Sequence, residues 1–314
     1  MEERKEWNIR TIYNTKGAAK EYCDYAVDIY TGCPHGCKYC YASAKAKRKN
    51  RDFTDVTVRP HIIEATKAYL NAHTELWGKT IFLGFESDPF PMNMDNTATY
   101  EMIKLLKSYG CHIMFCTKGR PNDNLINLLD NKDSVGITIT CGEEMSRIYE
   151  PNSATPKERL RLLKNAYLKG IETWISIEPV LEPEYIYSLL KSEDMKYVTK
   201  VKLGKLNHMN ISDLTGNESD VIDWTAYAKT VKDICDKRNI IYIIKDALAE
   251  YLDAVFLYEK VRERGHYECY RYKGVEIYSN LNYEWEWSIE EDDGDDVWFA
   301  SLKDAMEYID GGCK

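Results

Sequence analysis

The sequence predicts an α/β protein, an incomplete (β/α) barrel followed by a small α+β region at the C-terminal end. Three observations lead to this fold class. Short apolar segments of strand type alternate with helical segments through about residue 260, a pattern typical of a parallel sheet covered by helices. Seven strand candidates are present, one fewer than a closed eight-stranded barrel requires. From residue 265 onward, closely spaced strand candidates replace the alternation.

The expected strands are short and mostly apolar. They cover residues 25–30, 80–85, 112–116, 135–140, 172–177, 197–203 and 240–244. In βα barrels the loops after the carboxyl ends of the strands build the functional site. The loops expected to meet at one mouth are the cysteine-rich loop after the first strand and residues 86–91, 117–119, 141–144 and 178–179.

Helical segments are expected between these strands. They lie at about residues 42–50, 61–71, 97–109, 124–129 and 220–237, and from the last strand to about residue 264. One further helix has the clearest start, because Thr155 can act as the N-cap, Pro156 suits the first turn and Glu158 completes a capping box. Gly170 is expected to end that helix.

Three regions follow from these patterns. Residues 1–24 are polar without a clear period and are expected to form an N-terminal extension, and residues 25–264 should form the partial barrel. Residues 265–314 are expected to form a small α+β domain, with strands at 267–272, 275–280, 285–289 and 297–300 and a helix at 302–309. This appendage could bind a partner or substrate, or it could only cap the barrel.

Composition narrows the class of protein. The chain has 314 residues and ten cysteines, and its polar N-terminus does not resemble a secretory signal. No apolar run approaches the length of a membrane span. A reducing cytoplasmic location is therefore expected, without membrane association. The net charge of −9 argues against broad, sequence-independent duplex binding, which requires many cationic contacts to phosphate.

Charge is nevertheless uneven along the chain. A basic cluster follows the cysteine-rich loop and contains Lys45, Lys47, Arg48, Lys49 and Arg51. An acidic run occupies residues 290–296. A solvated surface is the simplest interpretation of both, although the basic cluster would also permit contact with phosphate.

Three cysteines lie close together in the loop after the first strand, at Cys33, Cys37 and Cys40. A cubic iron–sulfur cluster normally takes four cysteines, and no fourth follows at ligand spacing, so one iron would remain open for a small molecule. The alternatives are a zinc site that uses His35, a redox-active dithiol, or a buried structural group. The zinc alternative would strain the turn, because His35 lies between two of the ligands.

The segment TGCPHGCKYCYA resembles the cluster loop of the radical S-adenosylmethionine superfamily. Along about residues 25–210 the chain resembles the spore photoproduct lyase-like branch of that superfamily, through the segments GFESDPFP, TKG, VGITIT, RIYEP and GIETWISIEPV. The resemblance implies a core of about six parallel strands plus flanking elements. It also implies a [4Fe-4S] cluster held by Cys33, Cys37 and Cys40, and S-adenosylmethionine bound at the open iron. An electron donor of the flavodoxin or ferredoxin type would serve a lyase- or oxidoreductase-type radical enzyme.

The resemblance also implies roles for residues at the mouth. Tyr39 would lie near the adenine, Ser87 would hold the amino acid end of S-adenosylmethionine, and Lys118 would pair with its carboxylate. Thr140, together with Thr138, would contact the ribose. Glu178 ends the fifth strand and could accept a hydrogen bond from the ribose or a substrate hydroxyl. The alternatives are turn positions for Ser87 and Lys118 and a structural role for Glu178.

The substrate is less well defined by the sequence. The lyase of this branch uses a cysteine near the end of the second strand as a hydrogen-atom donor, and the corresponding segment 84–87 here contains none. Cys141 is a candidate donor or relay, or else an inert, partly buried thiol. The branch suggests a nucleic acid or nucleobase substrate, with a peptide or small metabolite as the alternative. A non-catalytic zinc-binding adaptor is the rival from another class of protein.

Overall fold

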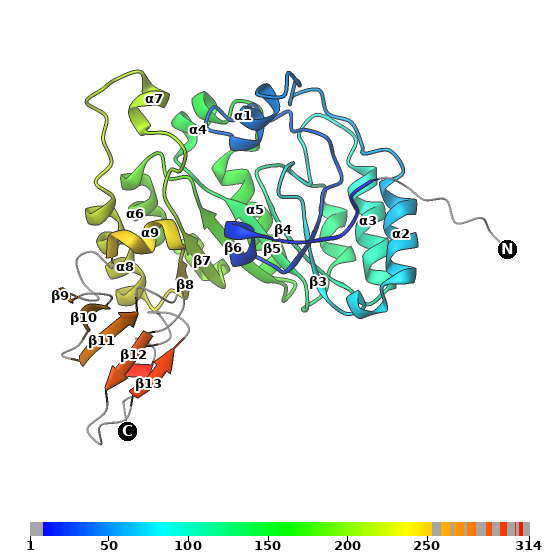
Figure 1. Ribbon diagram of the computed structural model, residues 1–314. Helices are drawn as coiled ribbons and strands as arrows, with labels where there is room; N and C mark the ends of the chain where they lie inside the picture. Colours follow the sequence, from blue (N-terminus) through cyan, green and yellow to red (C-terminus); the bar gives the residue numbers. More distant parts are fainter. Residues whose placement is uncertain are drawn as a thin grey trace. The chain divides into compact units, whose positions relative to one another are not determined.

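The computed structural model describes residues 9–252 and, beyond them, five strands together with residues 305, 308 and 309. The chain folds into two compact units. The first comprises residues 1–223 and 230–247, and the second comprises residues 224–229 and 248–314. Each unit is described by itself (Figure 1).

An eight-stranded sheet forms the first unit, and its strands follow one another in sequence order from β1 to β8. The strands are β1 (Tyr13–Asn14), β2 (Tyr25–Val27), β3 (Thr80–Leu83), β4 (His112–Thr117), β5 (Ser134–Thr138), β6 (Glu172–Ile177), β7 (Lys200–Leu203) and β8 (Tyr242–Ile244). Strands β2 to β8 are parallel, and β1 joins β2 antiparallel. Because β1 and β8 do not pair with each other, the sheet is open. The prediction of an incomplete barrel is confirmed, and all seven expected strands are present.

Helices connect the parallel strands, and one more, α9, follows the last of them. They are α1 (Tyr41–Lys47), α2 (Ile62–Ala72), α3 (Thr97–Ser108), α4 (Glu143–Tyr149), α5 (Pro156–Tyr167), α6 (Pro183–Lys191), α7 (Ile211–Thr215), α8 (Trp224–Arg238) and α9 (Asp246–Leu252). Short 3₁₀ helices cover Gly17–Glu21, Thr74–Leu76, Asp123–Leu128 and Glu193–Tyr197. The capping box predicted at Thr155 and Glu158 is present in α5. Within the described ranges, no helix combines the length and the apolar character that spanning a bilayer requires.

One face of the sheet carries the side chains that matter for the site. Successive residues of a strand point to opposite faces, and here the even-numbered residues share the inner one. Ala26, Phe82, Met114 and Trp174 form a buried cluster on it. Gly136 lies opposite Trp174, and a Cβ atom at this position would stand 2.3 Å from the indole ring. The bulk of Trp174 therefore requires glycine at residue 136.

The expected N-terminal extension contributes structure to the sheet unit. Tyr13 pairs with Ala26 as part of β1, and Tyr22 packs against the buried cluster on the inner face. The ring of Tyr22 lies 5.6 Å from that of Trp174. From residue 13 onward, the segment thus contributes a strand to the sheet and an aromatic side chain to the buried cluster on the inner face.

The second unit contains a five-stranded antiparallel sheet in the order β13-β12-β11-β10-β9. Its strands are β9 (Glu259–Arg264), β10 (Tyr267–Tyr272), β11 (Val275–Asn280), β12 (Trp287–Glu290) and β13 (Asp296–Phe299). The prediction of a helix continuing to about residue 264 was wrong, because α9 ends at Leu252 and Glu259–Arg264 pairs with β10. The four strands predicted downstream are present, β10 and β11 with the predicted bounds and β12 and β13 with shifts of one or two residues. Most of the predicted helix at 302–309 and of the acidic run lies outside the described residues.

Candidate active site

A cavity of about 530 Å³ lies at the carboxyl ends of the parallel strands, within the size range of small-molecule sites. Its walls contain the last residue of β5, Thr138, and residues that follow each of the other parallel strands, ending with Lys245 after β8. The cavity is also lined by Lys16, Ala18 and Ala19 of the N-terminal segment. The expectation that the loops converge on one mouth is confirmed for all of them except residues 141–144, which do not line the cavity.

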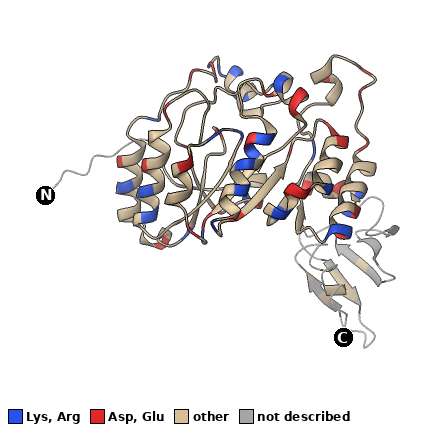
Figure 2. Cartoon of the chain, turned by 180° about the vertical axis from the view of Figure 1, so that it is seen from behind, with Lys and Arg blue, Asp and Glu red and all other residues tan. Residues whose placement is uncertain are grey.

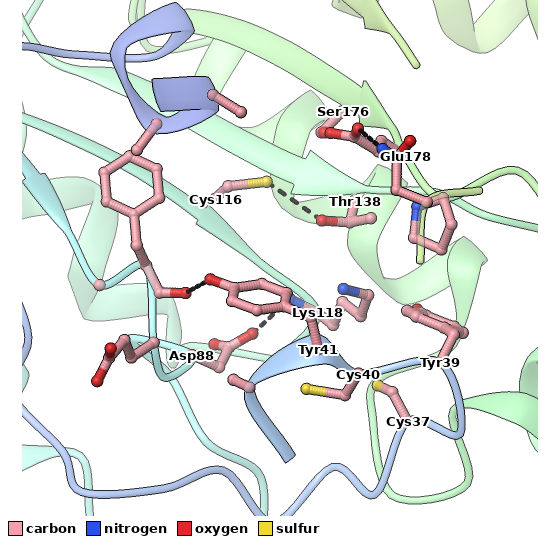
Figure 3. Close-up of a pocket in the computed structure, with 18 of the residues that line it drawn as sticks. Cys37, Tyr39, Cys40, Tyr41, Asp88, Cys116, Lys118, Thr138, Ser176 and Glu178 are labelled. Atoms are coloured by element: carbon pink, nitrogen blue, oxygen red, sulfur yellow. Dashed lines mark hydrogen bonds between the residues drawn. The ribbon is translucent and has the colours of Figure 1, made fainter. Parts of the chain in front are cut away.

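The three cysteines of the loop after β2 all face this cavity. Figure 3 shows Cys37 and Cys40 at one end of it, with Tyr39 beside them. The loop is tight, since a Cβ atom on Gly32 would approach the carbonyl oxygen of Phe53 to 2.2 Å. Burial raises the pKa of the Cys33 and Cys37 thiols to about 12.

Backbone contacts from other segments fix the cysteine loop. The amide of Cys33 donates to the Phe53 carbonyl at 2.9 Å, and the amide of Lys38 donates to the Tyr149 carbonyl at 2.9 Å. Asn152 binds the loop through its amide to the His35 carbonyl and through its side chain to the Pro34 carbonyl, each at 3.1 Å. The loop conformation is therefore set before any ligand is considered.

His35 is occupied with structural contacts. Its side chain is buried, and its Nε2 accepts a hydrogen bond from the Met92 amide at 3.1 Å. Nδ1 lies 3.6 Å from the Asp88 carboxylate, which itself accepts from the Thr117 hydroxyl at 2.5 Å. Burial holds the pKa of His35 below its ordinary value, in keeping with a neutral ring that accepts at Nε2. The zinc alternative would require the ring to give up these contacts.

Among the described residues, no three His, Cys, Asp or Glu side chains are arranged to hold a single metal ion. A four-iron cluster requires a different arrangement, because each cysteine binds its own iron. Three cysteines around one side of a cavity can bind three irons without their sulfur atoms converging on one point.

Ser87 and Lys118 provide polar groups on the wall beside the cysteines. The Ser87 hydroxyl is buried and has no hydrogen-bond partner among the described residues. In the same part of the chain, no carboxylate lies within ion-pair distance of the Lys118 ammonium, whose Nζ lies 5.6 Å from the centroid of the Tyr39 ring. Burial opposes its charge, but electrostatic interaction with Cys37 and Glu150 prevails and raises the pKa of Lys118. An unsatisfied hydroxyl and an available cation on one wall fit an anionic, hydrogen-bonding ligand.

Tyr39 is anchored by a buried carboxylate on the far side of the loop. Glu150 accepts hydrogen bonds from the Tyr39 hydroxyl and, at 2.8 Å, from the Thr140 hydroxyl. Arg159 completes this arrangement with an ion pair to Glu150 at 2.5 Å, in which both side chains are fully buried. Burial alone would raise the pKa of Glu150, but the charges of Arg159 and Lys118 and the Tyr39 hydrogen bond hold it below its ordinary value.

The two threonines predicted to contact the ribose separate in the structure. Thr138 lines the cavity, whereas Thr140 does not. The physical reason is that β5 ends at Thr138, after which the Thr140 hydroxyl turns to Glu150. The structure therefore leaves Thr138 as the threonine available to a cavity ligand.

Glu178 lies at the opposite end of the cavity from Cys37 and Cys40, next to Ser176 (Figure 3). Its carboxylate pairs with Lys245 and accepts from the Asn207 side chain at 2.9 Å. Tyr22 adds a longer hydrogen bond to Glu178, at 3.4 Å, and one to Ser176, at 3.0 Å. Burial opposes the Lys245 charge, yet Tyr22 and Glu178 raise the pKa of Lys245 above its ordinary value.

Aromatic rings line this second end. Phe82 and Phe85 are stacked with their ring centroids 4.2 Å apart, and the Tyr22 ring meets Phe85 edge-on at 5.9 Å. All three residues line the cavity. The cavity therefore has a cysteine-rich end and an aromatic end with a paired carboxylate.

The cysteine that lines the cavity beyond the cysteine loop differs from the one that the sequence suggested. Cys141 is fully buried and does not line the cavity, and burial raises the pKa of its thiol to about 12. Cys116, at the end of β4, does line it and lies 3.3 Å from the Thr138 hydroxyl. The expectation that Cys141 points into the mouth is therefore not met.

Tyr22, Cys116 and Lys245 are among the cavity residues that were missed from the sequence. Strand alternation contains the signal for Cys116, because it lies between Met114 and Lys118 on the same inner face. Tyr22 lacked such a signal, since it precedes the first expected strand.

The family model of the radical SAM superfamily matches residues 27–186. The chain belongs to the radical SAM superfamily. Among curated proteins, the uncharacterized protein ORF301 of Acidianus two-tailed virus is 27% identical over 62% of this chain and 71% of its own length. The uncharacterized protein Rv2578c of Mycobacterium tuberculosis is 26% identical over 50% of this chain and 49% of its own length.

Solved structures share the fold. Spore photoproduct lyase complexed with dinucleoside spore photoproduct superposes with a TM-score of 0.50 at 15% identity, covering 74% of each chain. SuiB of Streptococcus suis bound to S-adenosylmethionine superposes with a TM-score of 0.52 at 10% identity, covering 76% of this chain and 50% of SuiB. A [4Fe-4S] cluster and S-adenosylmethionine are the cofactors of the family, and the three cysteines, Ser87 and Lys118 fit them.

Proposed function

We propose that this chain cleaves S-adenosylmethionine reductively and uses the resulting radical to take a hydrogen atom from a substrate in the same cavity. One observation carries the proposal: three cysteines, a hydroxyl without a partner and a cation without a carboxylate among the described residues line one cavity. The cluster and S-adenosylmethionine together supply one-electron cleavage of the C5′–S bond, which gives methionine and a 5′-deoxyadenosyl radical.

The residues of the chain bind and orient these groups. Cys33, Cys37 and Cys40 hold the cluster, and Lys118 pairs with the carboxylate of S-adenosylmethionine. The Ser87 hydroxyl is available to bind the amino acid end of the cofactor. Thr138 lies further along the same wall, in a position suited to the ribose.

The substrate is proposed to be a nucleobase or a nucleoside-like group at the aromatic end. The rings of Tyr22 and Phe85 offer the kind of surface on which bases pack, and Ser176, Glu178 and Asn207 offer polar atoms for a base edge. The likeness to spore photoproduct lyase agrees with this class but is a likeness of fold. A peptide or a small metabolite is the alternative outcome of a substrate screen.

Cys116 is proposed as the hydrogen-atom donor to the substrate radical, in place of Cys141. Transfer of the thiol hydrogen would form a substrate C–H bond and leave a thiyl radical on Cys116. One electron from the protein reductant and one proton from solvent would then restore the thiol. The substrate gives up one hydrogen atom and regains one, so it is not reduced overall. Cys116→Ala should still form 5′-deoxyadenosine but lose the substrate-derived product, whereas Cys141→Ala should retain both. Retention of product by Cys116→Ala would exclude this role.

Anaerobic reconstitution with iron and sulfide tests the main proposal. The protein should bind iron and sulfide in equal amounts and form 5′-deoxyadenosine when dithionite is added. Cys37→Ala should lose the iron, and Lys118→Met should retain it but lose most of the 5′-deoxyadenosine. A fully loaded protein that forms no 5′-deoxyadenosine, or one that retains zinc in place of iron, would refute the proposal.

A further inference from the structure

We infer that the exposed basic end of α1 is the docking surface for a small acidic protein that delivers one electron to the cluster. This inference rests on the proposed function, because it assumes a cluster at the three cysteines. The surface is formed by Lys47, Arg48, Lys49 and Arg51 and is called the α1 basic patch below. The partner has the chemistry of a flavodoxin or ferredoxin, with an anionic surface around its redox group.

The α1 basic patch is uncompensated. All four side chains are exposed, and none of them makes an ion pair with another described residue. The neighbouring Lys45 differs, because its ammonium binds the Glu86 carboxylate at 2.6 Å. Figure 2 shows blue turns of helix in the region of α1. On a chain with a net charge of −9, four such cations form a local region that attracts an anionic surface.

The patch is directly connected to the cysteine loop. Cys40 is the N-cap residue of α1, and the Ser43 amide donates to its sulfur at 3.4 Å. On the inner side of the helix, Ala42 and Ala46 form a buried cluster against which Cys33 and Cys40 pack. Lys47 lies seven residues after Cys40, about 10 Å away at 1.5 Å per residue. A protein on the patch would thus be close to the cluster without entering the cavity.

A nucleic acid is a poorer fit to this surface. The net charge of the chain is −9, and broad binding to phosphate requires many cationic contacts, of which the patch supplies four. An electron carrier requires only a local contact, because the electron alone has to reach the cluster.

The transfer step is simple. The reduced carrier loses one electron and becomes oxidised, and the cluster gains that electron, with no bond formed or broken. Charge complementarity mainly raises the rate of encounter, by about 10- to 1,000-fold in steered associations, and this gain falls as ionic strength rises. The inference therefore predicts a salt-dependent rate that only a protein donor reveals.

The test uses the reconstituted full chain carrying Lys47→Glu, Arg48→Glu and Lys49→Glu together. 5′-Deoxyadenosine formation is measured with dithionite and, separately, with flavodoxin kept reduced by its reductase and NADPH. The flavodoxin-driven rate should fall about tenfold or more at low salt, and the difference from wild type should shrink near 1 M salt, where the Debye length is about 3 Å. The dithionite-driven rate should stay at the wild-type value.

A matched control carries Lys67→Glu, Lys104→Glu and Lys132→Glu, which reverse three exposed charges away from the cavity. It should retain both rates. Equal loss of both rates in the patch variant, or no loss with flavodoxin, would overturn the inference. It would also be overturned if the patch variant lost binding of a fluorescent single-stranded oligonucleotide while keeping its flavodoxin-driven rate.

A different result would show that the proposed function itself is wrong: wild-type protein would form no 5′-deoxyadenosine with dithionite. In that case salt-dependent flavodoxin binding, compared between wild type and the patch variant, still tests the surface. Binding that is unchanged in the variant would rule the patch out.

Discussion

At the residue scale, Lys118 is a half-buried cation whose charge is maintained by its surroundings rather than by a paired carboxylate among the described residues. If it binds the carboxylate of S-adenosylmethionine, Lys118→Met removes a charge-assisted hydrogen bond worth about 1.5–3 kcal/mol, a loss of about 10- to 150-fold in affinity. Equilibrium dialysis of radiolabelled S-adenosylmethionine against the reconstituted protein measures this. Lys132→Met, at an exposed position, should bind normally, and equal affinities in the two variants would contradict the assignment.

Cys116 and Cys141 differ in access, and a chemical probe can read that difference without knowledge of the substrate. In cluster-free protein, iodoacetamide should modify Cys116 well before Cys141, as followed by mass spectrometry of peptides. Because burial raises the pKa of Cys116 to about 11 and the thiolate is the nucleophile, the rate should rise with pH up to that value. In denaturant the two cysteines should react alike, and similar rates in the folded protein would contradict the placement.

The site was predictable from sequence in two ways, through the spacing of the three cysteines with the segments that resemble the family, and through polar residues at the ends of strands. Lys118, Thr138 and Glu178 lie on even-numbered positions at or after the ends of strands and face the cavity as expected. Thr140 shares that parity, but the chain turns after Thr138 and the side chain meets Glu150 instead. The Glu150–Arg159 pair joins residues of two different segments, a tertiary contact that no local pattern in the sequence encodes.

At the scale of elements, α4, α5 and the turn between them form the support of the cysteine loop. Arg159 also donates to the carbonyl oxygens of Thr138 and Ala154, at 2.9 and 2.8 Å, so one side chain joins β5 to this turn. Arg159→Met should lower the free energy of unfolding by about 3–5 kcal/mol, because it leaves the Glu150 charge buried without its partner. Anaerobic urea denaturation measures this.

The companion experiment replaces both partners. Glu150→Gln combined with Arg159→Met removes the buried charge as well, so part of the lost stability should return. A double variant as unstable as the sum of the two single changes would indicate that the pair is not energetically coupled.

Some helices and strands were predicted correctly from the sequence and others were missed, each for a physical reason. The capping box made α5 evident, and uninterrupted apolar runs revealed the parallel strands. The α6 helix was missed because Pro183 resembles a break, although proline is well tolerated in the first turn. Glu259–Arg264 is rich in good helix formers, and its pairing with β10 prevails over that local preference.

At the scale of the whole molecule, the cavity joins distant parts of the sheet unit. A ligand that binds only this assembled form stabilises it by about 2.7 kcal/mol at a hundredfold excess over its Kd. For a unit of this size, about 2–4 °C per kcal/mol gives a rise in Tm of about 5–10 °C. Anaerobic calorimetry with and without S-adenosylmethionine measures this rise, and Lys118→Met should show a smaller one at the same ligand concentration. An unchanged Tm in wild-type protein would argue against binding.

The cavity walls run from Lys16 to Lys245, so nearly the entire sheet unit has to be in place before the cysteines face their proposed neighbours. Cluster loading then becomes a late step of maturation, sensitive to damage far from the thiols. A pale, iron-poor variant can therefore arise from a loosened strand as readily as from a lost ligand. Colour should accordingly be compared with unfolding data before any side chain is counted among the iron ligands.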